Sequence, residues 1–325
     1  MRILKEDCPE QAGISKGESD MNYVIIGAGG TGGTLGAYLT KGGADVTLIA
    51  RGKHLEALKA HGLKMKEKWK NEEETIPVKA LSQEEYREKA DVVLVCVKGY
   101  SLDAVIPLIR QVSHKDSIVL PILNIYGTGG YLQEKIPELL VLDGCIYVSA
   151  AMEEPGTIIR HGGVCRVVFG TRSPREYRPE LKEIEKELCA CKIEGILSDN
   201  IRRDALQKFS YVSPAGAAGL YFNAVAGDFQ QEGEKREFFA SLIREIVALA
   251  EGMGIHFECD LVQRNLKIMG GLLPESDTSM QRDVKAGRQS EMDGLIFEVV
   301  RLGRKYQVPV PCYEKVAEKM HRMGY

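Results

Sequence analysis

The stretch Tyr23-Val24-Ile25-Ile26-Gly27-Ala28-Gly29-Gly30-Thr31-Gly32 decides the fold of this chain. It begins with an apolar run, as in a buried strand, and continues as a Gly-x-Gly-x-x-Gly string. The helical run Leu35–Leu39 follows, and a second strand-like run, Asp45–Ile49, comes next. A strand, a glycine-rich turn, a helix and a second strand within about 30 residues form the unit that binds dinucleotides in open α/β sheets.

The glycines of this turn have distinct expected roles. Gly27 allows a tight turn, Gly29 lets the backbone approach a pyrophosphate, and Gly32 lets the helix pack closely on the strand. The helix N-terminus would offer free N–H groups and the positive end of its dipole to the phosphates. We therefore expect the whole turn to bind the cofactor, namely Gly27, Ala28, Gly29, Gly30, Thr31 and Gly32. A glycine-rich turn without a ligand is the alternative.

The end of the second strand indicates which dinucleotide is bound. A carboxylate there would bind the ribose hydroxyls of NADH and would repel a 2′-phosphate. Arg51 stands at this place and Lys53 follows it, and a guanidinium can donate several hydrogen bonds to a phosphate. Asp45 precedes the strand and should lie at its far end. The sequence favours NADPH; the alternative is that Arg51 only caps the surface of the next helix.

Composition and charge bound the class of protein. The chain has 325 residues, more than one hydrophobic core usually serves, so two domains are expected. The net charge of −3 is small, which argues against nucleic acid and anionic membranes as partners. No run is apolar enough for a membrane span or a secretory leader, so we expect a cytoplasmic protein. The histidines show no metal-ligand spacing; no metal site is predicted, and surface or packing roles are expected for them.

Strand-like and helix-like runs alternate after Tyr23, which predicts parallel strands joined by crossover helices. The expected strands are 23–26, 45–49, 92–97, 118–120 and 145–150, and the expected helices are 33–41, 53–60, 102–110 and 180–189. Residues 157–160 and 166–169 should form an antiparallel hairpin across His161-Gly162-Gly163. From Ser198 onwards helical periodicity dominates, with helices expected over 201–213, 234–253, 259–268 and 289–305.

These runs predict an α/β protein with three parts. They are a flexible N-terminal extension (1–20), an NADP-binding Rossmann-type domain with a doubly wound parallel sheet (21–197), and an all-helical C-terminal domain for substrate binding and catalysis (198–325). The apolar stripe of the last long helix could serve a homodimer through the helical domain.

Further strings occur in a fixed order along the chain. They are VVLVCVK (92–98), LPILN (120–124), LQK (206–208), TSMQRD (278–283) and SEMD (290–293). Together with the glycine turn they resemble the ketopantoate reductase (2-dehydropantoate 2-reductase) family. The resemblance extends from about Met21 to the C-terminus, and the ordered set is far more specific than any one string.

The resemblance implies a general acid. Lys208 matches the family's lysine that protonates the substrate carbonyl oxygen as hydride arrives from the nicotinamide. Its neighbours, among them Leu206 and Phe209, are apolar, and burial favours proton donation because it lowers the pKa of an ammonium group. From the local sequence alone, the default interpretation of Lys208 is a surface lysine on an amphipathic helix.

Four other residues match functional positions of the family. Glu291 matches a glutamate that pairs with the lysine region and the cofactor ribose, and Ser279 matches a serine that hydrogen-bonds the substrate carboxylate. Asn124 matches an asparagine that contacts cofactor and substrate, and Lys98 matches a lysine of the cofactor site. Asn124 and Lys98 follow expected parallel strands, where open sheets bind ligands. A helix cap for Ser279 and a solvated carboxylate for Glu291 are the alternatives.

The sequence also departs from the family at the substrate side. Val212, Gly216 and Ala226 stand where asparagines are usual, and Leu295-Ile296-Phe297 replaces a more polar string. A site that hydrogen-bonds a substrate hydroxyl loses discrimination when those partners are missing. We therefore expect NADPH-dependent reduction of a 2-oxo acid, with ketopantoate to (R)-pantoate in pantothenate and coenzyme A biosynthesis as the named candidate. A different carbonyl substrate and a non-catalytic NADP-binding protein are the alternatives.

Overall fold

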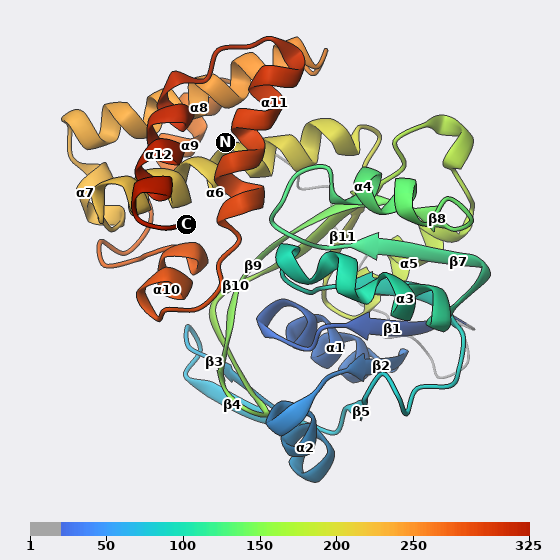
Figure 1. Ribbon diagram of the computed structural model, residues 1–325. Helices are drawn as coiled ribbons and strands as arrows, with labels where there is room; N and C mark the ends of the chain where they lie inside the picture. The colour runs from blue at the N-terminus through green and yellow to red at the C-terminus, as the bar shows by residue number, and fades with distance from the viewer. Residues whose placement is uncertain (1–20) are drawn as a thin grey trace. The chain divides into compact units, whose positions relative to one another are not determined.

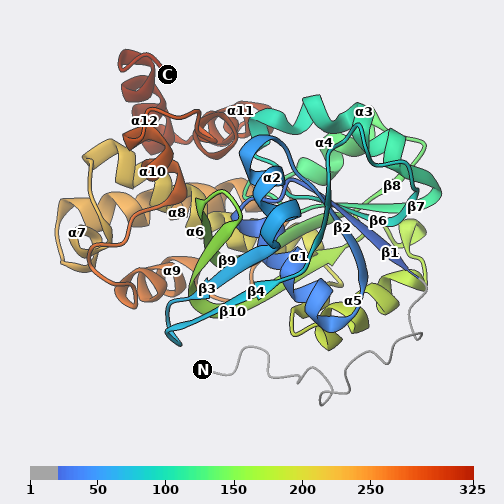
Figure 2. The ribbon, with the colours of Figure 1, turned by 90° about the horizontal axis from the view of Figure 1, so that it is seen from below.

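The computed structural model describes residues 21–325, and the chain forms two compact units (Figures 1 and 2). The first runs to Leu123 and resumes over Gly127–Ile201, and the second comprises Asn124–Tyr126 and Arg202–Tyr325. Ser198, where the sequence predicts that the helical domain begins, lies within the first unit. The extension expected over residues 1–20 lies outside the described residues.

Between residues 21 and 201, the first unit contains strands, α-helices and short 3-10 turns. The strands are β1 (Asn22–Ile26), β2 (Asp45–Ile49), β3 (Leu63–Glu67), β4 (Glu72–Ile76), β5 (Lys79–Leu81), β6 (Ala90–Val95), β7 (Ser113–Pro121), β8 (Leu140–Val141), β9 (Asp143–Glu154), β10 (Thr157–Gly170) and β11 (Glu194–Leu197). The helical elements are α1 (Gly30–Gly42), α2 (Gly52–His61), η1 (Gly99–Ser101), α3 (Leu102–Val112), α4 (Thr128–Lys135), η2 (Pro174–Glu176) and α5 (Glu180–Ala190).

A six-stranded parallel sheet forms the centre of this unit, with the order β5-β2-β1-β6-β7-β8. Alternate residues of β1 face two different cores. Tyr23 and Ile25 share a core with α1 and α5, whereas Val24 and Ile26 share a core with α3 and α4. Helices therefore cover both faces of the sheet, which confirms the doubly wound α/β fold expected from the sequence.

A second sheet was not expected, and two predictions in this region are wrong. Its order is β11-β10-β3-β4, with β9 paired to β10. Residues 145–150 are not a parallel strand, because β9 is antiparallel to β10. Residues 157–160 and 166–169 do not form a hairpin, because both belong to the single strand β10. The turn lies instead at Gly156, which has a φ of 83°.

A buried arginine explains why Gly162 and Gly163 do not end β10. The register between β9 and β10 shifts after Arg160, so the strand bulges there. Arg160 is fully buried, and its guanidinium donates to the carbonyl oxygens of residues 162–164 at distances between 3.0 and 3.2 Å. Glu67 pairs with the guanidinium at 3.0 Å. These bonds satisfy carbonyls that the bulge removes from the strand ladder, so the chain continues as a strand.

Helices make up the second unit, as predicted. They are α6 (Ile201–Phe222), α7 (Ala226–Gln230), α8 (Glu234–Gly252), α9 (Leu261–Gly270), α10 (Ser279–Lys285), η3 (Asp293–Phe297), α11 (Glu298–Tyr306) and α12 (Pro311–Arg322). The helix expected over 289–305 begins later, and η3 is a π-helical turn. Ser213 Oγ donates to the Leu295 carbonyl oxygen within that turn at 2.5 Å, which satisfies a group outside regular α-helical bonding.

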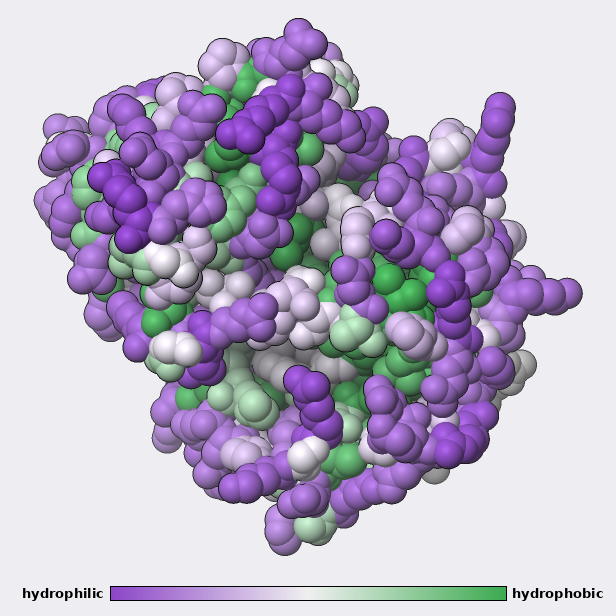
Figure 3. Space-filling view, viewed as in Figure 1, coloured by the Kyte–Doolittle hydropathy of each residue, from purple (hydrophilic) through white to green (hydrophobic). Residues whose placement is uncertain are grey.

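The molecular face drawn in Figure 3 is mostly hydrophilic. Strand β4 lies at the edge of the second sheet, and two of its glutamates, Glu73 and Glu74, pair with Lys64 and Lys41. Charges on an edge strand oppose pairing with another chain. No helix formed by residues 21–325 combines the length and the apolarity that crossing a membrane requires.

Helix α6 continues through Pro214, although the sequence predicts its end at Ser213. Proline lacks the N–H that would bond to the carbonyl of Ser210, four residues earlier. Asn265 of α9 replaces that donor: its Nδ2 donates to the Ser210 carbonyl oxygen at 2.9 Å and to Ser210 Oγ at 3.0 Å. Ser210 and Asn265 are both buried, so the bond satisfies a carbonyl that is out of reach of water.

We predict that Asn265→Leu lowers the free energy of unfolding by about 2 kcal/mol, because the Ser210 carbonyl then remains buried without a donor. The double variant Asn265→Leu/Pro214→Ala should regain part of this loss, since an alanine N–H can bond to the same oxygen. Urea unfolding followed by circular dichroism measures both, and Gln263→Leu on the exposed side of α9 is the control. A double variant no more stable than the single one would contradict the account.

Candidate functional site

The glycine turn joins β1 to α1. Gly27 has a φ of 99°, a left-handed conformation that glycine adopts without strain, and its N–H donates to the Ile49 carbonyl oxygen at 3.3 Å. A Cβ atom on Gly32 would lie 1.9 Å from the carbonyl oxygen of Gly27, so only glycine fits there. A Cβ atom on Gly29 would meet nothing within 4 Å, so the turn is open on that side.

The N-terminus of α1 carries no anion of its own. Gly29 is its N-cap residue and provides no side-chain cap, and the first turn contains no acidic residue. The first N–H groups of a helix have no partner within the helix, and the helix dipole makes this end positive. A phosphate suits such a turn, because it accepts several N–H bonds and its charge opposes the dipole.

Cationic side chains follow the carboxyl end of β2. Arg51 is the N-cap residue of α2, but its side chain makes no capping hydrogen bond, and both Arg51 and Lys53 are exposed. Asp45 pairs with Asn22 at the opposite end of β2, where the sequence places it. Lys98 follows β6, is half-buried and precedes η1. The arrangement can attract phosphate at the β2 end, and no carboxylate of β2 opposes it there.

Lys208 and Asn124, both expected in the site, are in direct contact with each other. Lys208 lies on α6 with 8% of its surface exposed, and its Nζ donates to Asn124 Oδ1 at 2.7 Å. Lysine is seldom buried to this degree unless it is paired. The structure therefore excludes the reading of Lys208 as a surface lysine on an amphipathic helix.

The segment Asn124–Tyr126 follows β7 and belongs to the second unit. Ile125 packs against Gly294 of η3, where an added Cβ atom would lie 2.3 Å from Ile125 Cδ1. The ring of Tyr126 lies 6.1 Å from that of Phe209, the neighbour of Lys208. Contacts with both η3 and α6 thus hold Asn124 against the ammonium group.

Glu291 and Ser279 occupy protected positions. Glu291 precedes η3 and is 5% exposed, so it is not a solvated carboxylate. Ser279 is the first residue of α10 and is half-buried. The cap of that helix is Thr278, whose Oγ1 accepts from the Gln281 N–H at 3.2 Å. Ser279 is therefore not the cap, which leaves its hydroxyl for another role.

The positions at which the family's asparagines are missing hold apolar residues, and Val212 and Ala226 pack in the apolar core of the second unit. Gly216 faces Met280, and an added Cβ atom would lie 2.5 Å from Met280 Cε. Met280 is buried and directly follows Ser279. Val212 is half-buried on α6, and Ala226 is buried at the start of α7. The absence of a side chain at Gly216 therefore lets α10 lie close against α6.

One residue at the glycine turn was not expected there from the sequence. His54, for which only a surface or packing role is expected, is half-buried, and its ring forms a hydrogen bond with the Ala28 carbonyl oxygen. No spacing pattern signals this contact, because the two residues come from different elements. Among residues 21–325, no cluster of three or more histidine, cysteine or acidic side chains could hold a metal ion.

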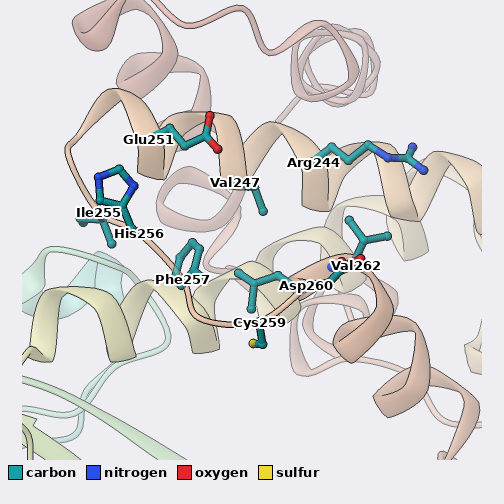
Figure 4. Close-up of a pocket in the computed structure, with 10 residues that line it drawn as sticks. Arg244, Val247, Glu251, Ile255, His256, Phe257, Cys259, Asp260 and Val262 are labelled. Atoms are coloured by element: carbon teal, nitrogen blue, oxygen red, sulfur yellow. Dashed lines mark hydrogen bonds between the residues drawn. The ribbon is translucent and has the colours of Figure 1, made fainter.

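A pocket of the second unit lies apart from these residues along the chain (Figure 4). It has a volume of about 330 Å³ between α8 and the segment that leads into α9, and its lining includes Arg244, Glu251, His256 and Asp260. Arg244 is already engaged by Glu237 at 2.6 Å, and Asp260 caps α9. None of the site residues expected from the sequence lines this pocket.

Comparison with known proteins gives the family. The family described as "Ketopantoate reductase PanE/ApbA" matches residues 23–174, and the family described as "Ketopantoate reductase PanE/ApbA C terminal" matches residues 200–324. The chain belongs to the ketopantoate reductase family. The family strings that the sequence shows in order are thus part of a match that covers both units.

Relatives in this family are similar over nearly their whole length. The chain is 28% identical to the 2-dehydropantoate 2-reductase of Mesorhizobium japonicum, over 94% of this chain and 98% of that protein. The structure of a PanE/ApbA family ketopantoate reductase from Ralstonia eutropha has a TM-score of 0.81 at 25% identity, covering 91% and 96% of the two chains. D-mandelate dehydrogenase with NADH and anilino(oxo)acetate shares the fold, with a TM-score of 0.82, 21% identity, and coverage of 93% and 98%.

We predict different effects on stability for alanine substitutions at two glycines of the turn. Gly32→Ala should lower the free energy of unfolding by about 3 kcal/mol, because its Cβ meets the Gly27 carbonyl oxygen and α1 must shift. Gly29→Ala should leave stability within about 0.5 kcal/mol of the parent, because its Cβ points into open space. Chemical denaturation measures both, and equal losses of stability in the two variants would show that this geometry is wrong.

Proposed function

We propose that the protein reduces a 2-oxo acid to a 2-hydroxy acid with NADPH, and that its substrate is 2-dehydropantoate, which yields (R)-pantoate for pantothenate and coenzyme A biosynthesis. The observation that carries the proposal is the buried Lys208, whose Nζ donates to Asn124 Oδ1 at 2.7 Å. Membership of the ketopantoate reductase family supports the reaction type. The relative from Mesorhizobium japonicum, named 2-dehydropantoate 2-reductase, supports the substrate.

Reduction of a carbonyl group adds a hydride to its carbon and a proton to its oxygen. When bound, NADPH would supply the hydride, which converts it to NADP⁺. Lys208 donates a proton from Nζ to the carbonyl oxygen as negative charge develops there, and solvent returns a proton to Nζ before the next turnover. Asn124 accepts a hydrogen bond from Nζ and so fixes the direction of the ammonium group, which avoids reorganisation during the reaction.

The remaining residues bind and orient. Ser279 donates its hydroxyl to the substrate carboxylate, which suits its half-buried position at the start of α10. Glu291 would accept a hydrogen bond from the cofactor ribose and would position Lys208; its burial supports such a role, because a buried carboxylate needs partners. Asn124 would contact both the substrate and the cofactor.

The first unit fits the dinucleotide in its NADPH form. The open side of Gly29 and the uncapped N-terminus of α1 suit the pyrophosphate, so residues 27–32 would hold it. Arg51 would bind the 2′-phosphate, because its exposed guanidinium follows β2 and can form paired hydrogen bonds with a phosphate. Lys98, after β6, would add a further contact to the cofactor.

A second substrate class is favoured by a specific observation. Met280 and Gly216 form an apolar contact beside Ser279, and Val212 adds another apolar side chain on α6. Such a wall suits a 2-oxo acid with an apolar or aromatic substituent. D-mandelate dehydrogenase, a structural neighbour, bears the name of a 2-hydroxy acid with an aromatic substituent.

We predict that Lys208→Ala lowers kcat by about 10²- to 10⁴-fold while NADPH still binds, because the variant loses the proton donor but keeps the glycine turn. Absorbance of NADPH at its nicotinamide band measures turnover, and quenching of protein fluorescence measures binding. Lys267→Ala, an exposed lysine of the same unit, is the control and should match the parent. Parent-like turnover in Lys208→Ala would remove the lysine from the mechanism.

A panel of 2-oxo acids tests the substrate. We predict that 2-dehydropantoate gives the highest kcat/KM, and that 3,3-dimethyl-2-oxobutanoate, which lacks only the hydroxyl group, follows within about tenfold. The small difference is expected because Val212 and Gly216 offer no hydrogen bond to that hydroxyl. If phenylglyoxylate leads the panel instead, the second substrate class replaces the first.

A further inference from the structure

The ring of His54 connects three parts of the first unit. His54 lies on the first turn of α2, and its Nε2 lies 2.8 Å from the Ala28 carbonyl oxygen in the glycine turn. Its Nδ1 accepts from the Gly156 N–H, at the turn between β9 and β10, at 2.9 Å. Figure 1 shows α2 beside the turn end of these two strands.

These two contacts define the tautomer of the ring. A nitrogen that accepts an N–H bond carries no proton, so Nδ1 is bare and the single proton of the neutral imidazole is on Nε2. Nε2 therefore donates to the Ala28 carbonyl oxygen. Both ring nitrogens are used, each in the role that the neutral ring allows, and the ring plane is held at two points.

Gly156 is itself fixed by its neighbours. Its φ of 83° suits glycine, and an added Cβ atom would lie 2.9 Å from Ala57 Cβ on α2. Its carbonyl oxygen accepts from the Lys64 N–H of β3 at 2.8 Å. The far side of the His54 bridge is therefore a rigid point of the second sheet rather than a loose loop.

On its other side, His54 lies next to both of the segments that are proposed to bind the cofactor phosphates. Ala28 belongs to the turn expected to hold the pyrophosphate, and its side chain is buried. Arg51, expected to hold the 2′-phosphate, directly precedes α2, only three positions before His54. A cofactor that bridges the two contacts gains most when the distance between them is fixed before it binds.

We propose that His54 is a positioning residue of the dinucleotide site, which holds the glycine turn and the start of α2 in register for the two phosphate groups of NADPH. The proposal rests on the proposed function, because it assumes that the first unit binds this cofactor. The ring touches the Ala28 backbone rather than the cofactor, so its contribution is to preorganise the site.

Three variants test the proposal. His54→Ala removes both hydrogen bonds and should raise the Kd and the KM for NADPH about tenfold, with kcat at saturating NADPH and the KM for the 2-oxo acid unchanged. His54→Asn keeps an acceptor near the Nδ1 position, and His54→Gln keeps a donor near the Nε2 position. Each should restore part of the affinity, because each retains one of the two bonds.

The ratio of the affinities for NADPH and NADH distinguishes a positioning role of His54 from a purely structural one. NADH lacks the 2′-phosphate, so it depends less on the placement of Arg51 relative to the turn. His54→Ala should therefore weaken NADPH more than NADH and lower the ratio of the two affinities. His61→Ala, an exposed histidine at the other end of α2, is the matched control and should leave both affinities unchanged.

The outcomes separate this proposal from the proposed function. If the parent binds NADPH and His54→Ala binds it as tightly, the role of His54 is overturned while the proposed function stands. If His54→Ala does not fold, parent-like NADPH affinity in both His54→Asn and His54→Gln has the same meaning. If His54→Ala weakens the binding of NADPH and of NADH equally, the claim that His54 sets the distance between the glycine turn and the start of α2 is overturned. A parent protein that binds no nicotinamide dinucleotide overturns both the proposed function and the role of His54.

Discussion

Burial of one ammonium group is the constraint around which the second unit is organised. Lys208 is almost inaccessible to solvent, and a charged group removed from water must recover its hydrogen bonds within the protein. Asn124 provides one, although it follows a strand of the first unit in the chain. Ile125 and Tyr126 anchor the same short segment against Gly294 and Phe209. A proton donor is thus available at a defined point, which the proposed carbonyl reduction requires.

Buried backbone irregularities in both units are each matched by a polar side chain. Asn265 replaces the N–H that Pro214 lacks in α6, the helix that carries Lys208. Arg160 binds the carbonyls freed by the bulge of β10, and Ser213 binds a carbonyl of the π-helical turn that follows Glu291. Unpaired backbone groups are costly inside a protein, so these side chains let irregular backbone persist in the buried parts of both units.

Local patterns predicted the elements whose hydrogen bonds are local. The strand, turn and helix around Gly27 and the helices α6, α8 and α9 follow from glycine placement and apolar periodicity, whereas α7, α10 and α12 were not predicted. The pairing of β9 with β10 could not be predicted, because two adjacent glycines at 162 and 163 are typical of a turn. Only the structure shows that Arg160 binds their carbonyl oxygens. The site was predicted only in part: the string containing Lys208 resembled a family, whereas its local sequence suited an exposed lysine.

The sequence by itself determined the doubly wound sheet, the helical second unit and the family, because these depend on periodicity and on ordered strings that persist without knowledge of contacts. Only the tertiary structure decided that Lys208 is buried against Asn124, that Thr278 rather than Ser279 caps α10, and that His54 bonds to the glycine turn. Such contacts join residues far apart in the chain, and side-chain burial and hydrogen bonding between distant elements have no signature in local sequence.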